Sequence, residues 1–229
     1  MRRRAVHDEQ KEERRQAILD TAWGLFQETP YSALTMAEIA EAAGLAKGTV
    51  FLYFKTKEAL FLALLEQQLA AWFTAIDAGL GEIEGVDRIS QVIALLSQQL
   101  EIRPGLTRLL AILHTVLEQN ISYAEARQFK YMLKEHFERT GAILERCLPF
   151  LRTGEGAHLL LQCDALVIGL WQLADPAPVV KQVVQEPALR LFELRFKDEF
   201  AAALHVLLHG LQRTAQLRAR DVHEEKEST

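Results

Sequence analysis

The stretch LTMAEIAEAAGLAKGTVFLYFKTK, residues 34–57, decides the fold of this chain. It reads as two short helices joined by a tight turn. Thr35 is a good N-cap, and Glu38 three residues later completes a capping box. Gly44 stands where the chain must reverse with a positive φ, which glycine adopts at little steric cost. A second helix, predicted at about 46–54, would enter a DNA major groove as in a helix-turn-helix.

Apolar and polar side chains divide over this stretch. The apolar ones that can fill the space between these helices and the helix before them are Ile39, Leu45, Val50 and Phe54. Lys47, Thr49 and Tyr53 are left to face outward. The small residues that would let the two helices cross closely are Ala40, Ala43 and Gly48. Lys57 opens the next helix after the N-cap Thr56, and a Lys at a helix N-terminus suits a phosphate oxygen.

The pattern resembles the TetR/AcrR family of one-component bacterial repressors. The matching positions are Thr35, Ile39, Ala40, Ala43, Gly44, Gly48, Thr49, Tyr53, Phe54, Lys57, Glu58 and Leu60. The match covers the N-terminal quarter, and the remainder is similar in helix content and length rather than in motif. Two positions depart from the family. Ala46 cannot cap the recognition helix as the usual Ser or Thr does, and Phe51 lacks the phosphate-seeking hydroxyl of the usual Tyr.

The residues that meet DNA follow from this pattern and this resemblance. Lys47, Thr49 and Tyr53 are predicted to contact bases, and Gly48 would allow a close approach. Thr35 and Lys57 are predicted to contact phosphates, together with Tyr53. The full predicted DNA-binding set is Thr35, Lys47, Gly48, Thr49, Phe51, Leu52, Tyr53 and Lys57.

The charge distribution fits this interpretation better than the net charge does. The chain of 229 residues carries a net charge of −5, which taken globally argues against DNA binding. Charges cancel within residues 1–60, so the whole acidic excess lies in the remainder. Basic residues cluster at the arm Arg2–Arg4 and at the recognition element, which is the footprint of a DNA-binding face. The arm either enters a flanking minor groove or is a solvated tail.

Composition indicates an ordinary globular protein, with 49% hydrophobic and 25% charged residues. The sequence contains no run of about 18 apolar residues, so no membrane span is predicted. Its polar start lacks the apolar core of a secretory signal. The cysteines, Cys147 and Cys163, are too few for a disulfide framework and lack a Cys-x-x-Cys spacing. We therefore expect a protein of the reducing cytoplasm without membrane contact or redox sensing.

Helical periodicity predicts an all-α fold with an N-terminal helix-turn-helix head and a larger C-terminal helical domain. The resemblance implies that this larger domain serves ligand binding and dimerisation. The predicted domains are 1–58 for DNA binding, 59–220 for effector binding and dimerisation, and 221–229 as a disordered tail. The long helix at 57–80 reaches beyond the head and can transmit a shift. The predicted helices are 8–28, 57–80, 86–100, 104–119, 123–148, 156–173 and 188–217.

A homodimer is the expected assembly. The segment 158–171 is apolar on nearly every side, which requires burial all round. The segment 192–211 carries a wide stripe formed by Phe192, Phe196, Phe200, Ala203, Leu207 and Leu211, with Leu204 and Leu208 beside it. These two helices are predicted to pair with their symmetry mates in a four-helix bundle, the alternative being an intrachain core.

The C-terminal domain is expected to hold an effector pocket, because the resemblance implies one. The predicted lining is Trp72, Phe73, Leu110, His114, Phe129, Phe137 and Trp171, although any one of them could be ordinary core. The function predicted is a dimeric repressor of a palindromic operator, released by a small apolar or amphipathic effector. The alternative is a C-terminal domain that binds a protein partner instead.

Enzymatic chemistry has no positive support in the sequence. Gly154 and Gly156 lack the Lys-Ser/Thr of a nucleotide-binding loop. His205 and His209 stand at a spacing that can bind zinc, but no third ligand is evident, and such a pair is more often a polar strip at an interface. We therefore expect no catalytic site, no metal and no cofactor.

Overall fold

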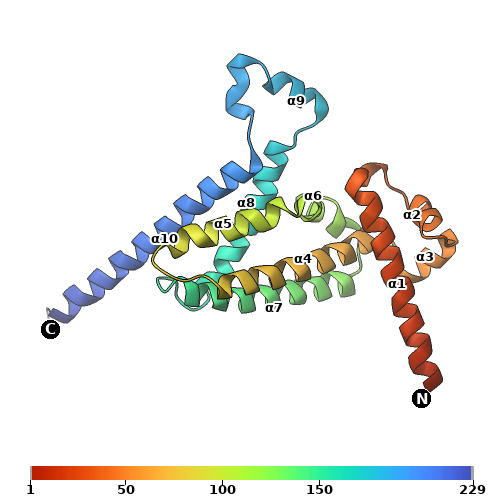
Figure 1. Ribbon diagram of the computed structural model, residues 1–229, viewed down its shortest axis with the longest axis horizontal. Helices are drawn as coiled ribbons and strands as arrows, with labels where there is room; N and C mark the ends of the chain where they lie inside the picture. The colour runs from red at the N-terminus through yellow and green to blue at the C-terminus, as the bar shows by residue number, and fades with distance from the viewer. Residues whose placement is uncertain (1, 228–229) are drawn as a thin grey trace. The chain divides into compact units, whose positions relative to one another are not determined.

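The computed structural model describes the backbone of residues 2–227 and the side chains of residues 9–221. Within this range the chain forms helices and no β-strand, which confirms the predicted all-α class (Figure 1). It divides into two compact units. The first comprises Met1–Gln68 and Ile112–Phe129, and the second Leu69–Ala111 and Lys130–Thr229.

In the first unit, α1 packs against the short helices of the predicted helix-turn-helix (Figure 1). The elements in chain order are α1 (Arg2–Glu28), η1 (Tyr31–Ala33), α2 (Met36–Ala42), α3 (Lys47–Tyr53), the first turns of α4 (Lys57–Gly81), η2 (Leu117–Asn120) and the first turns of α7 (Tyr123–Cys147). Ile18 and Phe26 of α1, Ile39 of α2 and Val50 of α3 are at most 1% exposed. Burial of each such side chain contributes roughly 1.5–3 kcal/mol, so this core fixes the three helices together.

The caps predicted around α2 are present. Thr35 Oγ1 accepts from the backbone N–H of Glu38 at 3.2 Å, and Glu38 Oε2 accepts from the N–H of Thr35 at 2.8 Å. Gly44 has φ +66°, as predicted, and the Leu45 N–H donates to the Ala40 carbonyl at 2.9 Å. These bonds satisfy backbone groups at both ends of α2 and set the direction in which α3 departs.

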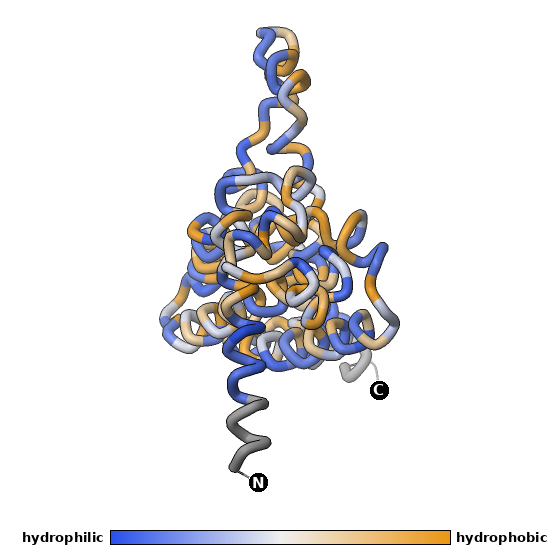
Figure 2. Tube along the Cα trace, turned by 90° about the vertical axis from the view of Figure 1, so that its right-hand side faces the viewer, coloured by the Kyte–Doolittle hydropathy of each residue, from blue (hydrophilic) through white to orange (hydrophobic). Residues whose placement is uncertain are grey.

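In the second unit, α10 packs against α5 and α8. The unit's elements are the rest of α4, α5 (Arg88–Glu101), α6 (Pro104–Leu113), the rest of α7, α8 (Glu155–Ala174), α9 (Pro178–Val184), η3 (Pro187–Phe192) and α10 (Phe196–Glu227). Figure 2 shows hydrophobic and hydrophilic residues interspersed along the helices of the chain, as amphipathic helices require. Leu106 and Leu109 of α6, Leu159 of α8 and Leu204 of α10 are all 0% exposed.

Two glycines let α7 and α8 approach closely. A Cβ atom built on Gly156 would come closer than 3.0 Å to the backbone carbonyl of Gly141. A Cβ atom built on Gly141 would meet the backbone nitrogen of Ala157 equally closely. Backbone atoms cannot swing aside as a flexible side chain can, so both positions require glycine for contact rather than for φ.

Several predicted helix limits differ from the structure. The helix expected at 104–119 ends at Leu113, because Val116 has φ −130° and ψ −60°, outside the helical region. The helix expected from residue 188 begins at Phe196, after Glu193 leaves the helical conformation with ψ 82°. Phe192 is consequently outside the predicted stripe and 58% exposed.

The ends of the chain are more helical than predicted. α1 begins at Arg2 instead of residue 8, and α10 continues to Glu227, into the range 221–229 expected to be disordered. Residues 2–7 contain three Arg and one Ala, residues 221–227 contain three Glu and one Lys, and neither segment contains Gly or Pro, a composition that favours helix. The side chains of Arg2–Arg4, and hence the groove role predicted for them, lie outside the described residues.

Two helices, α4 and α8, are long and apolar enough to cross a membrane by length and composition alone. The apolar window of α4 is 61% buried inside the protein, whereas that of α8 is 22% buried. Core helices of soluble proteins meet the same criteria, so these two are weak evidence for a span. In α8 the low burial identifies a face that its own unit leaves uncovered.

Candidate functional site

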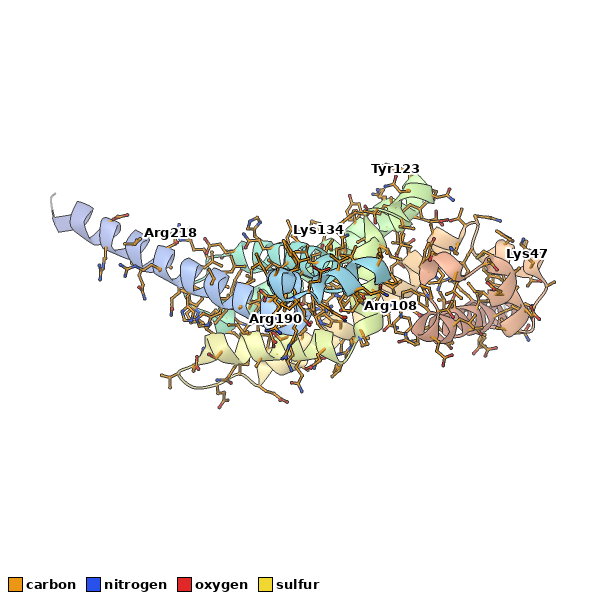
Figure 3. All side chains as sticks on the ribbon, turned by 90° about the horizontal axis from the view of Figure 1, so that it is seen from above. Lys47, Arg108, Tyr123, Lys134, Arg190 and Arg218 are labelled. Carbon is orange, nitrogen blue, oxygen red and sulfur yellow. The ribbon has the colours of Figure 1, made fainter. Side chains whose placement is uncertain are left out.

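Helix α3 has an exposed face opposite an apolar anchor. Val50 is 0% and Phe54 4% exposed, so one side of the helix is fixed in the core of the first unit. Lys47 and Gly48 are exposed, and Leu52 is 73% exposed. Figure 3 shows Lys47 at the surface of this unit. The remaining predicted contact residues on α3, Thr49, Phe51 and Tyr53, are half-buried.

The role predicted for Gly48 in helix crossing is wrong. A Cβ atom built on Gly48 would find nothing within 4 Å, so the fold does not need glycine there. The open space lies on the exposed side of α3, next to Lys47, whose Nζ is 5.9 Å from the Phe51 ring centroid. A glycine in a helix is less stable than Ala, so a Gly48 without a packing reason is best explained by the close approach of something outside the unit.

Thr35 and Lys57, the predicted phosphate ligands, already have partners within the first unit. The Thr35 hydroxyl donates to Glu38 Oε2 at 2.8 Å. Lys57 Nζ donates to the carbonyls of Tyr31 at 2.9 Å and Leu34 at 2.8 Å, and lies 3.9 Å from the Tyr31 ring centroid. Burial lowers the pKa of Lys57. Its ammonium therefore fixes the turn before α2, and phosphate binding would use its remaining N–H group.

A hydrogen-bonded carboxylate joins this turn to η2. Glu58 Oε1 accepts from the Tyr31 hydroxyl at 2.9 Å, and Glu58 Oε2 accepts from Asn120 Nδ2 at 3.1 Å. Burial, and then the bond to Glu58, raise the pKa of Tyr31 and keep its hydroxyl protonated as a donor. Thr56 Oγ1 donates to the Asn120 carbonyl at 2.9 Å and accepts from the Ala59 N–H at 3.0 Å, which confirms Thr56 as the N-cap.

The predicted effector residues are not gathered in one unit. His114, exposed and 2.9 Å from Glu118, and Phe129 belong to the first unit, and the others to the second. Phe73 makes an edge contact with Trp72 at 4.9 Å and one with Phe137 at 5.9 Å. It also stacks on His136 at 4.6 Å, while Trp171 contacts Phe196 at 5.5 Å and Leu110 is buried.

The interior of the second unit contains polar atoms without partners. Trp72 Nε1, Thr107 Oγ1 and Ser97 Oγ are buried and form no hydrogen bond within the described part of the chain. Thr107 is 1% and Trp72 8% exposed. An unsatisfied buried donor costs about 1–3 kcal/mol, and such groups persist where a ligand completes the bond. Trp72 was in the predicted set, whereas Thr107 was not.

Comparisons with known protein families settle the class of the chain. Residues 18–64 match the family described as "Bacterial regulatory proteins, tetR family". Residues 66–215 match the one described as "Tetracyclin repressor-like, C-terminal domain". The chain belongs to the TetR family. It is a transcriptional regulator whose helix-turn-helix binds DNA and whose C-terminal domain is of the ligand-binding kind, in a family of regulators rather than enzymes.

Two known proteins are similar to this chain over different lengths of its sequence. The nucleoid occlusion factor SlmA from Alteromonas mediterranea is 25% identical over 193 residues, covering 84% of this chain and 94% of that protein. The regulator RutR from Escherichia coli is 35% identical over 65 residues, only 28% of this chain and 31% of that protein. The sequence likeness to RutR is thus much more local.

Solved structures of TetR regulators superpose on this chain and share its fold. FadR from Bacillus halodurans, a fatty acid degradation regulator, has a TM-score of 0.54 at 19% identity, covering 85% of this chain and 94% of that chain. FadR from Bacillus subtilis, solved with stearoyl-CoA, has a TM-score of 0.52 at 18% identity, covering 85% and 98%. At such identity the likeness establishes the fold.

An uncovered apolar groove of about 720 Å³ lies between α8 and α10 in the second unit. It is lined by Gln162, Ala165, Leu166, Leu170, Glu199, Ala202, Ala203, Val206 and Leu207. Val206 is 72% and the neighbouring Leu161 53% exposed. Phe200, Leu204 and Leu208 are instead buried, so α10 has one apolar face for its own unit and another that faces outward.

The other titratable groups singled out in the sequence form no reactive centre. His205 and His209 have ring centroids 4.3 Å apart, and among the described residues no group of three metal-binding side chains occurs. Cys147 and Cys163 are both buried as free thiols. Burial raises the pKa of Cys163 to about 12, which keeps that thiol protonated and poorly reactive.

The structure reveals functional candidates that pattern reasoning missed. Tyr31, Glu58 and Asn120 form their network across 27 and 62 residues of sequence, a separation that no local pattern encodes. Thr107 could have been found, since it and Arg108 are the polar residues of α6 and Thr107 is buried beside Leu106 and Leu109.

Proposed function

We propose that this TetR regulator is a homodimeric cytoplasmic repressor that an amphipathic effector releases from a palindromic operator. The observation that carries the proposal is helix α3, anchored through Val50 while Lys47, Gly48 and Leu52 are exposed. A helix presented in this way can place base-reading side chains in a major groove. Lys47, Thr49 and Tyr53 would contact bases, with Leu52 and Phe51 supplying apolar contacts to sugars or thymine methyl groups.

The dimer in this proposal forms through α8 and α10. TetR regulators act as dimers, and the groove between these helices exposes contiguous apolar side chains such as Leu166 and Val206. The low burial of α8 has the same explanation, since a second copy would cover it. Two recognition helices related by the dimer axis would then meet half-sites about one DNA turn apart.

The effector in this proposal has a long apolar part and a polar group. The second unit buries Phe73, Leu110 and other apolar residues, yet Trp72 Nε1 and Thr107 Oγ1 form no hydrogen bond within the described part of the chain. A ligand that fills apolar space and hydrogen-bonds these atoms would satisfy both features. Because a FadR structure holds stearoyl-CoA, long-chain acyl compounds are the first probes to try.

The experiment is a selection of genomic DNA fragments followed by release measurements with stearoyl-CoA and stearate. We expect one palindromic site to be enriched and at least one probe to weaken its binding. In the Thr107→Val variant the probe should act about tenfold more weakly without loss of thermal stability, because Thr107 Oγ1 has no partner to lose. Ser97→Ala, which removes another unpaired buried hydroxyl, is the control.

Three outcomes would contradict the proposal in separate ways. If no specific site were enriched, the proposal that the protein binds an operator would be wrong. If the enriched site lacked inverted symmetry, the proposal that a two-fold dimer binds it would be wrong. Equal responses of wild type and Thr107→Val to an active probe would remove Thr107 from the effector site.

The route from effector to DNA in this proposal passes through Glu58. α4 contributes residues to both units, as does α7, and η2 stands between α6 and α7 in the chain. A shift of η2 would move Asn120, and the Glu58 carboxylate would carry that movement to Tyr31 and the turn before α2. The two bonds of one carboxylate thus couple η2 to the base of the helix-turn-helix.

The variant Asn120→Ala should bind operator within about threefold of wild type but respond to effector at least about fivefold less, the low end of typical coupling energies. The measurement is operator affinity with and without a saturating active probe. Gln119→Ala is the matched control, because among the described residues Gln119 Nε2 bonds only the nearby His114 carbonyl, at 2.9 Å. An Asn120→Ala protein that is released as fully as wild type would exclude this route.

A further inference from the structure

Beside the recognition helix, α1 contributes a basic wall that the helix-turn-helix pattern does not include. A groove of about 250 Å³ lies between α1 and the C-terminal half of α3. It is lined by Gln10, Lys11, Arg14, Leu52 and Tyr53. Figure 1 shows α1 continuing past α3 toward the N-terminus. We propose that this groove binds a phosphate of the operator backbone, an inference that rests on the proposed function.

The chemistry of the lining suits a phosphodiester. Gln10 supplies an amide, Lys11 an ammonium and Arg14 a guanidinium, and Tyr53 adds a phenolic hydroxyl from α3. All of these groups donate hydrogen bonds, and the groove contains no carboxylate among its lining residues. Phosphate oxygens are acceptors only, so a donor-lined groove beside a base-reading helix matches the DNA backbone.

The charges of α1 are sorted around the helix. At about 100° per residue, Gln10, Lys11 and Arg14 occupy one sector of roughly 100°. The acidic residues of the same turns, Glu9, Glu12 and Glu13, fall in a sector on the other side. The charges of residues 1–60 sum to zero, but on α1 they are separated into a basic face and an acidic face. The basic face adjoins α3.

The cations of α1 differ in whether they have partners within the protein. Arg15 has partners within the protein: its guanidinium lies 5.2 Å from the Phe54 ring centroid and 3.4 Å from Glu12. Lys11 and Arg14 are exposed and form no ion pair within the described part of the chain. Their charges are thus available to DNA at little desolvation cost, and each phosphate neutralised would release counterions from the duplex.

The test is the salt dependence of operator binding by Lys11→Ala/Arg14→Ala. Loss of one phosphate contact per protomer should reduce the slope of log affinity against log salt by about 0.9 per protomer, and so by nearly two per dimer. The control is Arg213→Ala/Arg220→Ala, which removes the same charge from exposed positions on α10. A reduced slope in the α1 variant, with the control unchanged, supports the groove.

Duplexes with single methylphosphonate substitutions locate the contact. They also distinguish binding of a DNA phosphate from binding of a free anion in the groove. Neutralising the phosphate that fits the groove should weaken wild type severalfold and the α1 variant hardly at all. A slope unchanged in the α1 variant, or reduced equally in the control, overturns the inference. So does a scan in which no single neutralised phosphate weakens binding by wild type more than binding by the α1 variant. If wild type selects no operator, it is the proposed function that fails.

Discussion

Replacing Gly48 by Ala is expected to abolish most operator binding while leaving the fold as stable as before or more so. Gly48 is the second residue of α3, where Ala is favoured over Gly by at most about 1 kcal/mol, and the added methyl group has nothing within 4 Å to strike. The same methyl group would stand between α3 and the DNA, beside Lys47. We expect the dissociation constant to rise at least about tenfold, equivalent to 1.4 kcal/mol, and the melting temperature not to fall.

Gly24→Ala is the matched control for this experiment. Gly24 is also an exposed glycine inside a helix, α1, with nothing within 4 Å of a built Cβ atom. It should gain similar stability without changing DNA affinity. If Gly48→Ala bound operator as tightly as Gly24→Ala does, the surface of α3 around Gly48 would not approach DNA, and the proposed orientation of the recognition helix would be wrong.

The sequence predicted the parts of the fold that depend on near neighbours. The capping box of Thr35 and Glu38 spans three residues, and the positive φ of Gly44 follows from the reversal after a short helix. Such features are encoded within one turn of chain. The class of fold and the position of the recognition helix could be read for the same reason.

The internal use of Lys57 could not be predicted in this way. Its Nζ donates to carbonyls 23 and 26 residues earlier in the chain. Because every residue has a backbone carbonyl, the sequence does not show which carbonyl will accept a hydrogen bond. A Lys opening a helix is equally consistent with a phosphate ligand and with a structural contact. Only the placement of the turn after η1 distinguishes them, and that placement is a property of the packed unit.

The effector residues were the least predictable part for a related reason. Aromatic residues at helical spacing mark buried faces whether or not a ligand is present, so Phe129 and Phe73 looked alike although they belong to different units. The more selective signal is a buried polar atom without a partner, as in Thr107. Detecting it requires the positions of every neighbouring donor and acceptor.

Replacing Gly156 by Ala is expected to cause the largest loss of stability of any single methyl group added to the second unit. The methyl group would overlap the Gly141 carbonyl, so α7 and α8 would have to separate. The N–H of Gly156 also donates to Glu145 Oε1 at 3.0 Å, and that bond would lengthen with the separation. Overpacking of this kind costs about 1–3 kcal/mol and at times more, which urea unfolding can measure.

Gly169→Ala separates this effect from helix propensity. Gly169 lies on the same helix, α8, is exposed, and has nothing within 4 Å of a built Cβ atom. Alanine there should raise stability by about 0.5–1 kcal/mol, whereas at Gly156 the same gain is exceeded by the clash. A Gly156→Ala protein as stable as Gly169→Ala would mean that α7 and α8 do not cross as closely as the two glycines indicate.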